Sequence, residues 1–306
     1  MFPDGPADPG MRHGAPRAHS SDNRGLGCRR PRRALPVPPP PVVPSARPML
    51  RPLLRPLLRP LSRALAAGGW EIGRRRDRLD AELADLSPAD RAIVERVEPY
   101  TMTSLARRAS LLQAVDHVLR AGIPGDIVEC GVWRGGSMMA VALALQARGD
   151  TARELFLYDT FEGMNAPTEA DRSHHGERAA DQLARTPRGE GVWCEAGLED
   201  VQANLAATGY PAGRIHCVRG PVEQTIPGTL PGRIALLRLD TDWYESTRHE
   251  LEHLYPLLQP GGVLIIDDYG HWQGARRAVD EYFAAQPLPV YLHRVDYTAR
   301  LMVKAG

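Results

Sequence analysis

Cysteine is scarce in this sequence. The 306-residue chain contains Cys28, Cys130, Cys194 and Cys217, and no two of them form a C-x-x-C pair. Four scattered cysteines are too few for a disulfide framework, and their spacing matches neither the common structural zinc motifs nor a dithiol redox motif. We therefore expect a reduced, cytoplasmic protein.

Long apolar runs are also missing. No run approaches the roughly 18 residues that a membrane-spanning helix needs. The first residues lack the basic segment, apolar core and cleavage site of a secretory signal. We expect a soluble intracellular protein without a membrane partner.

Acidic residues are rare at the start of the chain. Residues 1–70 contain twelve arginines and three aspartates, with no glutamate or lysine, which gives about +9. Because the whole chain carries +1, the remainder carries about −8. A non-enzymatic nucleic-acid-binding protein that uses this basic arm is one hypothesis, but it predicts a basic folded domain. The acidic remainder argues against a nucleic-acid partner.

Proline is concentrated where the acids are rare. Fifteen of the 28 prolines precede residue 61, including the run Pro36–Pro41 and a repeat with proline at every fourth position over Arg51–Leu61. Each interior proline costs a helix about 3 kcal/mol. We predict a disordered Pro/Arg-rich tail over residues 1–86 and a folded domain over residues 87–306, whose first helix begins at the capping sequence Ser87-Pro88-Ala89-Asp90.

Short apolar runs alternate with helical patterns through the rest of the chain. Predicted strands cover 127–130, 155–158, 215–218, 234–239 and 263–266, and predicted helices cover 104–122, 137–148, 246–258 and 274–285. Continuous apolar strands separated by helices indicate a mainly parallel sheet that is covered on both faces. We predict a doubly wound α/β fold of the Rossmann-like type, with two antiparallel edge strands from Val290–Val303.

A glycine-rich loop follows the first predicted strand. It reads Glu129-Cys130-Gly131-Val132-Trp133-Arg134-Gly135-Gly136-Ser137 and lacks the G-x-G-x-x-G spacing of a dinucleotide site. A nucleotide-sugar or NAD-dependent oxidoreductase, the main alternative enzyme, requires that spacing. Glu129 suits a ligand with an ammonium group, and Asp159, at the end of the second strand, is placed to bind both hydroxyls of a ribose. Each feature alone also fits a simple turn.

Two further strands end in aspartates. Asp240 and Asp242 follow the strand 234–239, and Asp267 and Asp268 follow the strand 263–266. If these strands are neighbours, the carboxylates repel one another unless they are protonated or hold a cation. Oxygen ligands without nearby cysteine or paired histidine favour Mg²⁺ or Mn²⁺ over zinc. The alternative is that these aspartates only cap helices or end strands in solvent.

Together these segments resemble the macrocin O-methyltransferase family, metal-dependent enzymes that methylate sugar hydroxyls of macrolide and aminocoumarin natural products. The resemblance runs from about residue 90 to the end of the chain. It is carried by the segments 100–103, 123–136, 158–164, 240–247 and 266–270. It implies the fold of a class I methyltransferase, with S-adenosylmethionine as methyl donor and Mg²⁺ as cofactor.

The resemblance also assigns roles to individual residues. It implies that the loop residues Glu129, Gly131, Trp133, Gly135, Gly136 and Ser137 hold the methionine part of S-adenosylmethionine, that Asp159 binds its ribose, that Met102 and Thr103 close over it, and that Asp240, Asp267 and Asp268 bind Mg²⁺.

The proton acceptor is less sharply defined. The resemblance points to Asp242 as general base, although a carboxylate here also suits the ordering of water beside the metal. His271 is the rival base, and His174 and His175, in the long polar segment 164–191, are weaker candidates.

The implied reaction is methylation of a sugar hydroxyl on a glycosylated secondary metabolite, as in antibiotic biosynthesis. Trp243, Tyr244 and Trp272 suit an apolar platform for this acceptor and suit buried packing equally well. We expect a small-molecule glycoside as partner and a homo-oligomer as the assembled form.

Overall fold

The computed structural model describes residues 81–287 and 289–306. Its first full helix, α3 (Pro88–Val97), begins where the capping sequence predicts, and the Ser87 hydroxyl accepts the Asp90 backbone N–H at 3.1 Å. Most of the tail predicted over residues 1–86 lies outside the described residues. Leu83 and Leu86 nevertheless pack into the core, so buried packing starts a few residues before residue 87.

Seven strands form one mixed sheet in the order β3-β2-β1-β4-β5-β7-β6. The strands are β1 (Asp126–Cys130), β2 (Leu155–Asp159), β3 (Ile215–Arg219), β4 (Ile234–Leu239), β5 (Leu258–Ile266), β6 (His293–Arg294) and β7 (Arg300–Val303). Strands β1 to β5 pair with one another in parallel, and β7 is antiparallel to both β5 and β6. This confirms the predicted mainly parallel sheet with an antiparallel C-terminal edge.

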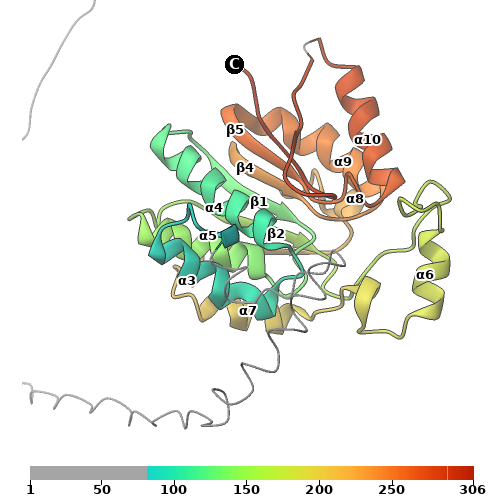
Figure 1. The fold of residues 1–306 in the computed structure, drawn as a ribbon, viewed down its shortest axis with the longest axis horizontal. Coiled ribbons are helices and arrows are strands. Elements are labelled where there is room, and N and C mark those ends of the chain that lie inside the picture. The colour runs from blue at the N-terminus through green and yellow to red at the C-terminus, as the bar shows by residue number, and fades with distance from the viewer. Residues whose placement is uncertain (1–80, 288) are drawn as a thin grey trace, which may run out of the picture. The chain divides into compact units, whose positions relative to one another are not determined.

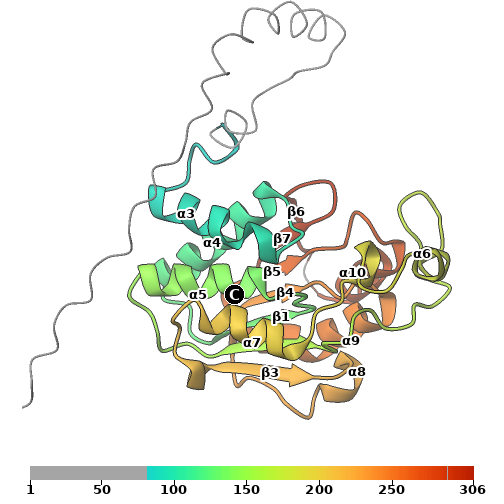
Figure 2. The same cartoon turned by 90° about the horizontal axis from the view of Figure 1, so that it is seen from below.

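Helices cover both faces of the sheet (Figures 1 and 2). On one face lie α3, α4 (Leu105–Arg120), α5 (Gly136–Ala147) and α7 (Leu198–Ala206), and on the other lie α8 (Val222–Thr225), α9 (Tyr244–Leu254) and α10 (Gln273–Ala284). Short 3₁₀ turns cover Glu98–Tyr100, Gly191–Trp193, Ala212–Arg214 and Tyr255–Leu257. No helix in the described part of the chain is both long enough and apolar enough to cross a bilayer.

The strand sequences are apolar on both sides because both faces are buried. Ile127 of β1 and Ile265 of β5 pack towards α4 and α5, whereas Val128 and Leu264, one residue along, pack towards α9 and α10. The chain order reverses direction at β1, which pairs with β2 on one side and β4 on the other. The loops after β1, β2, β4 and β5 therefore converge at one edge of the sheet, where such folds bind ligands.

The polar segment 164–191 is not a single open loop. It contains α6 (Ala179–Arg185) and extends beyond the end of the sheet to which the parallel strands point (Figure 2). Asp171, which is fully buried, fastens the segment to α9 by accepting the Tyr244 backbone N–H at 2.8 Å, and Ser173 forms a β-bridge with Trp272. The sequence offers no apolar period long enough to predict the seven-residue α6.

Candidate active site

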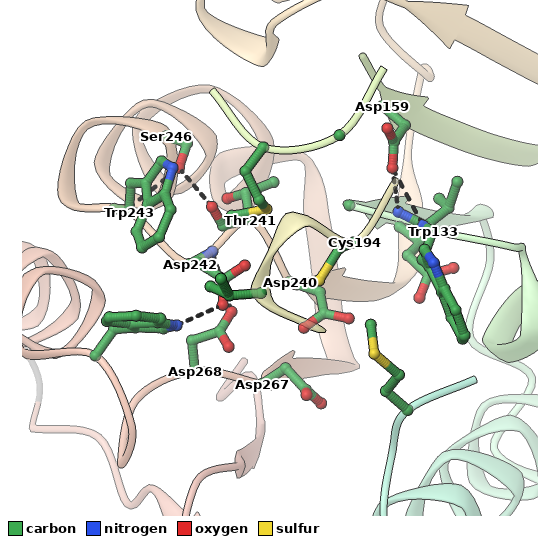
Figure 3. Close-up of a pocket in the computed structure, with 18 of the residues that line it drawn as sticks. Trp133, Asp159, Cys194, Asp240, Thr241, Asp242, Trp243, Ser246, Asp267 and Asp268 are labelled. Carbon is green, nitrogen blue, oxygen red and sulfur yellow. Dashed lines mark hydrogen bonds between the residues drawn. The ribbon is translucent and has the colours of Figure 1, made fainter. Parts of the chain in front are cut away.

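A cavity of about 400 Å³ opens at the carboxyl edge of the sheet (Figure 3). Its described lining includes twelve of the fourteen predicted site residues, namely Met102, Thr103, Glu129, Gly131, Trp133, Ser137, Asp159, Asp240, Asp242, Asp267, Asp268 and His271. Its volume suits a small molecule rather than a macromolecule. The structure thus gathers residues from the loops after β1, β2, β4 and β5, and from the segment before α4, into one cavity wall.

Asp159 ties the glycine loop to β2. Its Oδ2 accepts the backbone N–H groups of Val132 at 2.7 Å and Trp133 at 3.2 Å, and its Oδ1 accepts that of Phe161 at 2.7 Å. Burial raises the pKa of Asp159, while these backbone donors oppose that rise. The Thr160 hydroxyl also donates to Oδ1 of Asp159, at 3.5 Å. A carboxylate has about four lone-pair sites, so these four internal bonds leave little capacity for a ligand. Asp159 therefore shapes the loop as well as lining the cavity.

The loop glycines accommodate the protein's own backbone. Gly131 has φ +78°, and a Cβ there would overlap the carbonyl of Asp240, while a Cβ on Gly136 would overlap the carbonyl of Tyr100. Gly135 caps the start of α5 in the left-handed region with φ +80°. Gly135 and Gly136 are not among the described residues that line the cavity. These two glycines pack against the protein's own atoms, and their contact with a cofactor stays a prediction.

A Gly131→Ala substitution should be strongly destabilising. A left-handed φ costs an alanine about 1–2 kcal/mol, and moving the Asp240 backbone aside adds about 1–3 kcal/mol. Gly149 is the matched control, because its φ is +79° and no described atom lies within 4 Å of a Cβ placed there. Urea unfolding should therefore show a larger loss for Gly131→Ala than for Gly149→Ala. Equal losses in the free energy of unfolding would mean that the Asp240 backbone moves aside at no cost in energy.

Glu129 is buried against an arginine that the sequence analysis did not select. Its side chain is 1% exposed and accepts a hydrogen bond from Arg238 through Oε1. Burial raises the pKa of Glu129 to about 7, although Arg238 and the Ser137 hydroxyl lower it. Its Oε2 has no hydrogen-bond partner among the described residues. An unpartnered buried carboxylate oxygen is costly, so this atom is suited to a ligand that donates a hydrogen bond.

Three aspartate carboxylates lie close together in the cavity (Figure 3). One ligand oxygen each from Asp240, Asp267 and Asp268 lies within 4.8 Å of the others. Burial raises the pKa of Asp240 and Asp268 far above their usual range, and the neighbouring carboxylates add to the rise. The donor set consists of hard oxygens, and Asp267 Oδ1 is buried without a hydrogen bond to any described residue. These residues fit a divalent ion such as Mg²⁺.

Two arginines partly neutralise this acidic cluster. Arg238 contacts Asp240 and Asp267 as well as Glu129, and Arg107 of α4 pairs with Asp267 and with Asp296 of the C-terminal hairpin. Sequence reasoning missed both. Arg238 was detectable, because it is the lone charge within the apolar strand 234–239, whereas Arg107 lies on an ordinary helix and carried no such signal.

Asp242 is held in an uncommon backbone conformation. Its φ is +68°, and its backbone N–H donates to Asp268 Oδ2 at 3.2 Å. The Trp272 indole donates to Asp242 Oδ1 at 2.6 Å. Burial, with Asp240 adding to it, raises the pKa of Asp242 to about 7. The turn thus points a carboxylate of fixed orientation at the cavity.

His271 lies at the edge of the same cavity. Its Nδ1 is 3.2 Å from the Tyr297 hydroxyl, and the ring of His174 lies 5.1 Å away. Burial lowers the pKa of His271, and His174 and Arg107 lower it further, so its neutral form is favoured at pH 7. His174 and His175 are not among the described lining residues of the cavity.

The predicted aromatic platform is only partly present. Trp243 and Trp272 line the cavity and pack edge to face with ring centroids 4.9 Å apart. Tyr244 instead donates its hydroxyl hydrogen to Glu281 on α10. At the mouth, Met102 is 52% exposed, and Thr103 N–H donates to Thr101 Oγ1 at 3.2 Å.

The mostly parallel seven-stranded sheet with its antiparallel C-terminal edge has the class I methyltransferase fold. Residues 80–304 match the family described as macrocin O-methyltransferase (TylF), and the chain belongs to this family of O-methyltransferases. This confirms the resemblance found in the sequence.

Similar proteins are named as O-methyltransferases. The chain is 43% identical over 65% of its length to 8-demethyl-8-(2,3-dimethoxy-alpha-L-rhamnosyl)-tetracenomycin-C 4′-O-methyltransferase of Streptomyces olivaceus, of which 73% is covered. It is 35% identical over 60% of its length to mycinamicin III 3″-O-methyltransferase of Micromonospora griseorubida, of which 70% is covered. The solved O-methyltransferase NovP is 29% identical, with a TM-score of 0.59 over 68% of this chain and 83% of that chain.

Proposed function

We propose that this protein transfers the methyl group of S-adenosylmethionine to a sugar hydroxyl of a glycosylated secondary metabolite, with Mg²⁺ bound at the acidic cluster. The single observation that carries this proposal is that the Asp240, Asp267 and Asp268 carboxylates line the same cavity as Glu129 and Asp159. The names of the tetracenomycin and mycinamicin relatives support a sugar hydroxyl as acceptor.

The residues near β1 and β2 fit the methyl donor. The unpartnered Glu129 Oε2 suits the ammonium of its methionine part. Asp159 holds the glycine loop at the end of β2, the position where nucleoside-binding sheets bind a ribose, and its own contact with that ribose is a prediction. Met102 and Thr103 lie at the mouth, where they are placed to cover the bound donor. Methyl transfer from an activated donor depends mainly on alignment, which these fixed contacts supply.

The residues after β4 and β5 fit the metal and the acceptor. Asp240, Asp267 and Asp268 would hold Mg²⁺, which lowers the pKa of a hydroxyl group and fixes its oxygen when bound. Asp242 is the group we assign to receive the hydroxyl proton, because Trp272 orients its carboxylate within the same wall. Trp243 and Trp272 supply an apolar surface for the sugar.

Calorimetry with two cofactors distinguishes this proposal from the oxidoreductase alternative. The protein should bind S-adenosylmethionine or S-adenosylhomocysteine and should not bind NAD, since the loop lacks the dinucleotide spacing. A screen of deoxysugar-bearing glycosides with labelled S-adenosylmethionine should then identify the acceptor. Tight binding of NAD without binding of S-adenosylhomocysteine would overturn the proposal.

Glu129→Gln should weaken cofactor binding. A hydrogen bond to a charged group contributes about 1.5–3 kcal/mol, so we expect the Kd for S-adenosylhomocysteine to rise by about 10- to 100-fold. Glu199→Gln, on the exposed side of α7, is the control and should leave the Kd unchanged. An unchanged Kd in Glu129→Gln would remove Glu129 from the cofactor site.

A further inference from the structure

A single buried arginine connects the two halves of the cavity. Arg238 on β4 is 3% exposed and is the register partner of Glu129 on β1 and of Ile265 on β5. Because side chains alternate along a strand, Asp267, two residues after Ile265, shares the face of the sheet that Glu129 and Arg238 occupy. That face is covered by α4 and α5. The strands β1, β4 and β5 thus place the Arg238 guanidinium between Glu129, which is proposed to bind the methyl donor, and the aspartates proposed to bind the metal.

The two terminal nitrogens of the Arg238 guanidinium contact different carboxylates. Nη1 donates to Glu129 Oε1 and to Asp240 Oδ2, the latter at 2.7 Å. Nη2 lies 2.7 Å from Asp267 Oδ1, close enough for an ion pair but not aligned as a hydrogen bond. Glu129 Oε2 therefore accepts no hydrogen bond from a described residue. Asp267 Oδ1, although ion-paired with Nη2, accepts none either. Arg238 fixes each carboxylate while leaving it able to bind a ligand.

Charge alone does not account for this arrangement. Three carboxyl groups contact the Arg238 guanidinium, and Arg107 pairs with one of them, so carboxyl groups outnumber arginines here, which suits a cationic ligand on each side. An arginine stays protonated in any protein environment, and its planar fork binds several oxygens in fixed directions. A lysine would keep the charge but lose those directions.

We propose that Arg238 is a positioning residue that orients Glu129 for the methyl donor and Asp240 and Asp267 for the metal, so that both ligands depend on it although it is assigned to bind neither. The inference rests on the proposed function. The positioning role and simple electrostatics predict opposite effects of Arg238→Gln on the affinity for a divalent cation. Loss of a positive charge would by itself tighten the binding of the cation, whereas loss of the positioning contacts weakens it.

Binding measurements on the full chain test this inference. We expect Arg238→Lys and Arg238→Gln to weaken binding of both S-adenosylhomocysteine, measured by calorimetry, and Mn²⁺, measured by electron paramagnetic resonance, by about 10- to 100-fold each, the range seen when partners of metal ligands are changed. Arg148→Lys is the matched control, because Arg148 pairs with Asp90 and Asp116 away from the cavity. It should leave both affinities unchanged.

The outcomes separate this inference from the function on which it rests. Circular dichroism melting identifies any variant that fails to fold. If one Arg238 variant does not fold, the two affinities of the other variant test the inference. If the wild type binds neither ligand, the proposed function fails. If the wild type binds both, but a folded Arg238 variant keeps both affinities within twofold or binds Mn²⁺ more tightly, the function stands and the positioning role of Arg238 is overturned.

Discussion

Asp268→Asn is expected to abolish divalent-ion binding and to lower kcat/KM for methyl transfer by about 10³-fold, because metal polarisation supplies several kcal/mol of transition-state stabilisation. Asp268 is buried, and its ligand oxygen lies within 4.8 Å of those of Asp240 and Asp267. Asparagine keeps the size of the side chain and an oxygen that can accept the Asp242 backbone N–H. The substitution therefore removes the charge of the side chain but keeps its hydrogen bond with the Asp242 backbone.

The matched control is Asp85→Asn. Asp85 is exposed, and its side chain accepts the Gln113 amide, a bond that an asparagine oxygen can also accept. It should retain wild-type Mn²⁺ affinity and activity. An Asp268→Asn variant that keeps Mn²⁺ affinity and activity near the wild-type values would show that the acidic cluster is only a structural feature of the strand ends.

Asp242→Asn should lower kcat by about 10²- to 10⁴-fold, the usual contribution of a positioned general base. Asparagine tolerates a left-handed φ at least as well as aspartate, so the turn at φ +68° should persist. The amide oxygen can still accept the Trp272 indole N–H. Steady-state kinetics should therefore show a fall in kcat, while the Kd for S-adenosylhomocysteine stays within about threefold of the wild-type value.

His271→Asn provides the comparison for Asp242. The His271 backbone N–H donates to the Asp268 carbonyl oxygen, but its ring contacts Tyr297 and forms no hydrogen bond with a described carboxylate of the acidic cluster. We therefore expect its loss to lower kcat by less than about tenfold. The opposite ranking, with His271→Asn the more damaging substitution, would move the role of general base to His271.

The fold was predictable because its strands are buried on both faces. Apolar runs such as Ile234–Leu239 and the cap at Ser87 specify their structure locally, and most predicted strands and helices lie within a few residues of the observed ones. The exception is the junction of α9 and β5, where the helix predicted to reach residue 258 ends at Leu254 and the strand predicted from residue 263 begins at Leu258. The helices α6 and α7 were missed because they are short and their sequences are polar or mixed. Tertiary contacts such as that of Asp171 with α9 support the segment that contains α6.

The acidic cluster was predictable from topology. Once β4 and β5 are neighbours, Asp240 and Asp267 must meet at the same edge of the sheet. The countercharges were not predicted, since Arg107 comes from a helix that crosses this edge only in the folded chain. The glycines gave an ambiguous signal, because a glycine needed for packing against Tyr100 looks the same in a sequence as a glycine needed to contact a ligand.

Methyl transfer with and without a chelator tests the central claim most directly. The full chain would be assayed with labelled S-adenosylmethionine and an accepted glycoside in buffer, in EDTA, and in EDTA followed by excess Mg²⁺. With Asp240, Asp267 and Asp268 as metal ligands, product formation should stop in EDTA and return with Mg²⁺. Undiminished methylation in EDTA would contradict the assignment of these carboxylates to a catalytic metal.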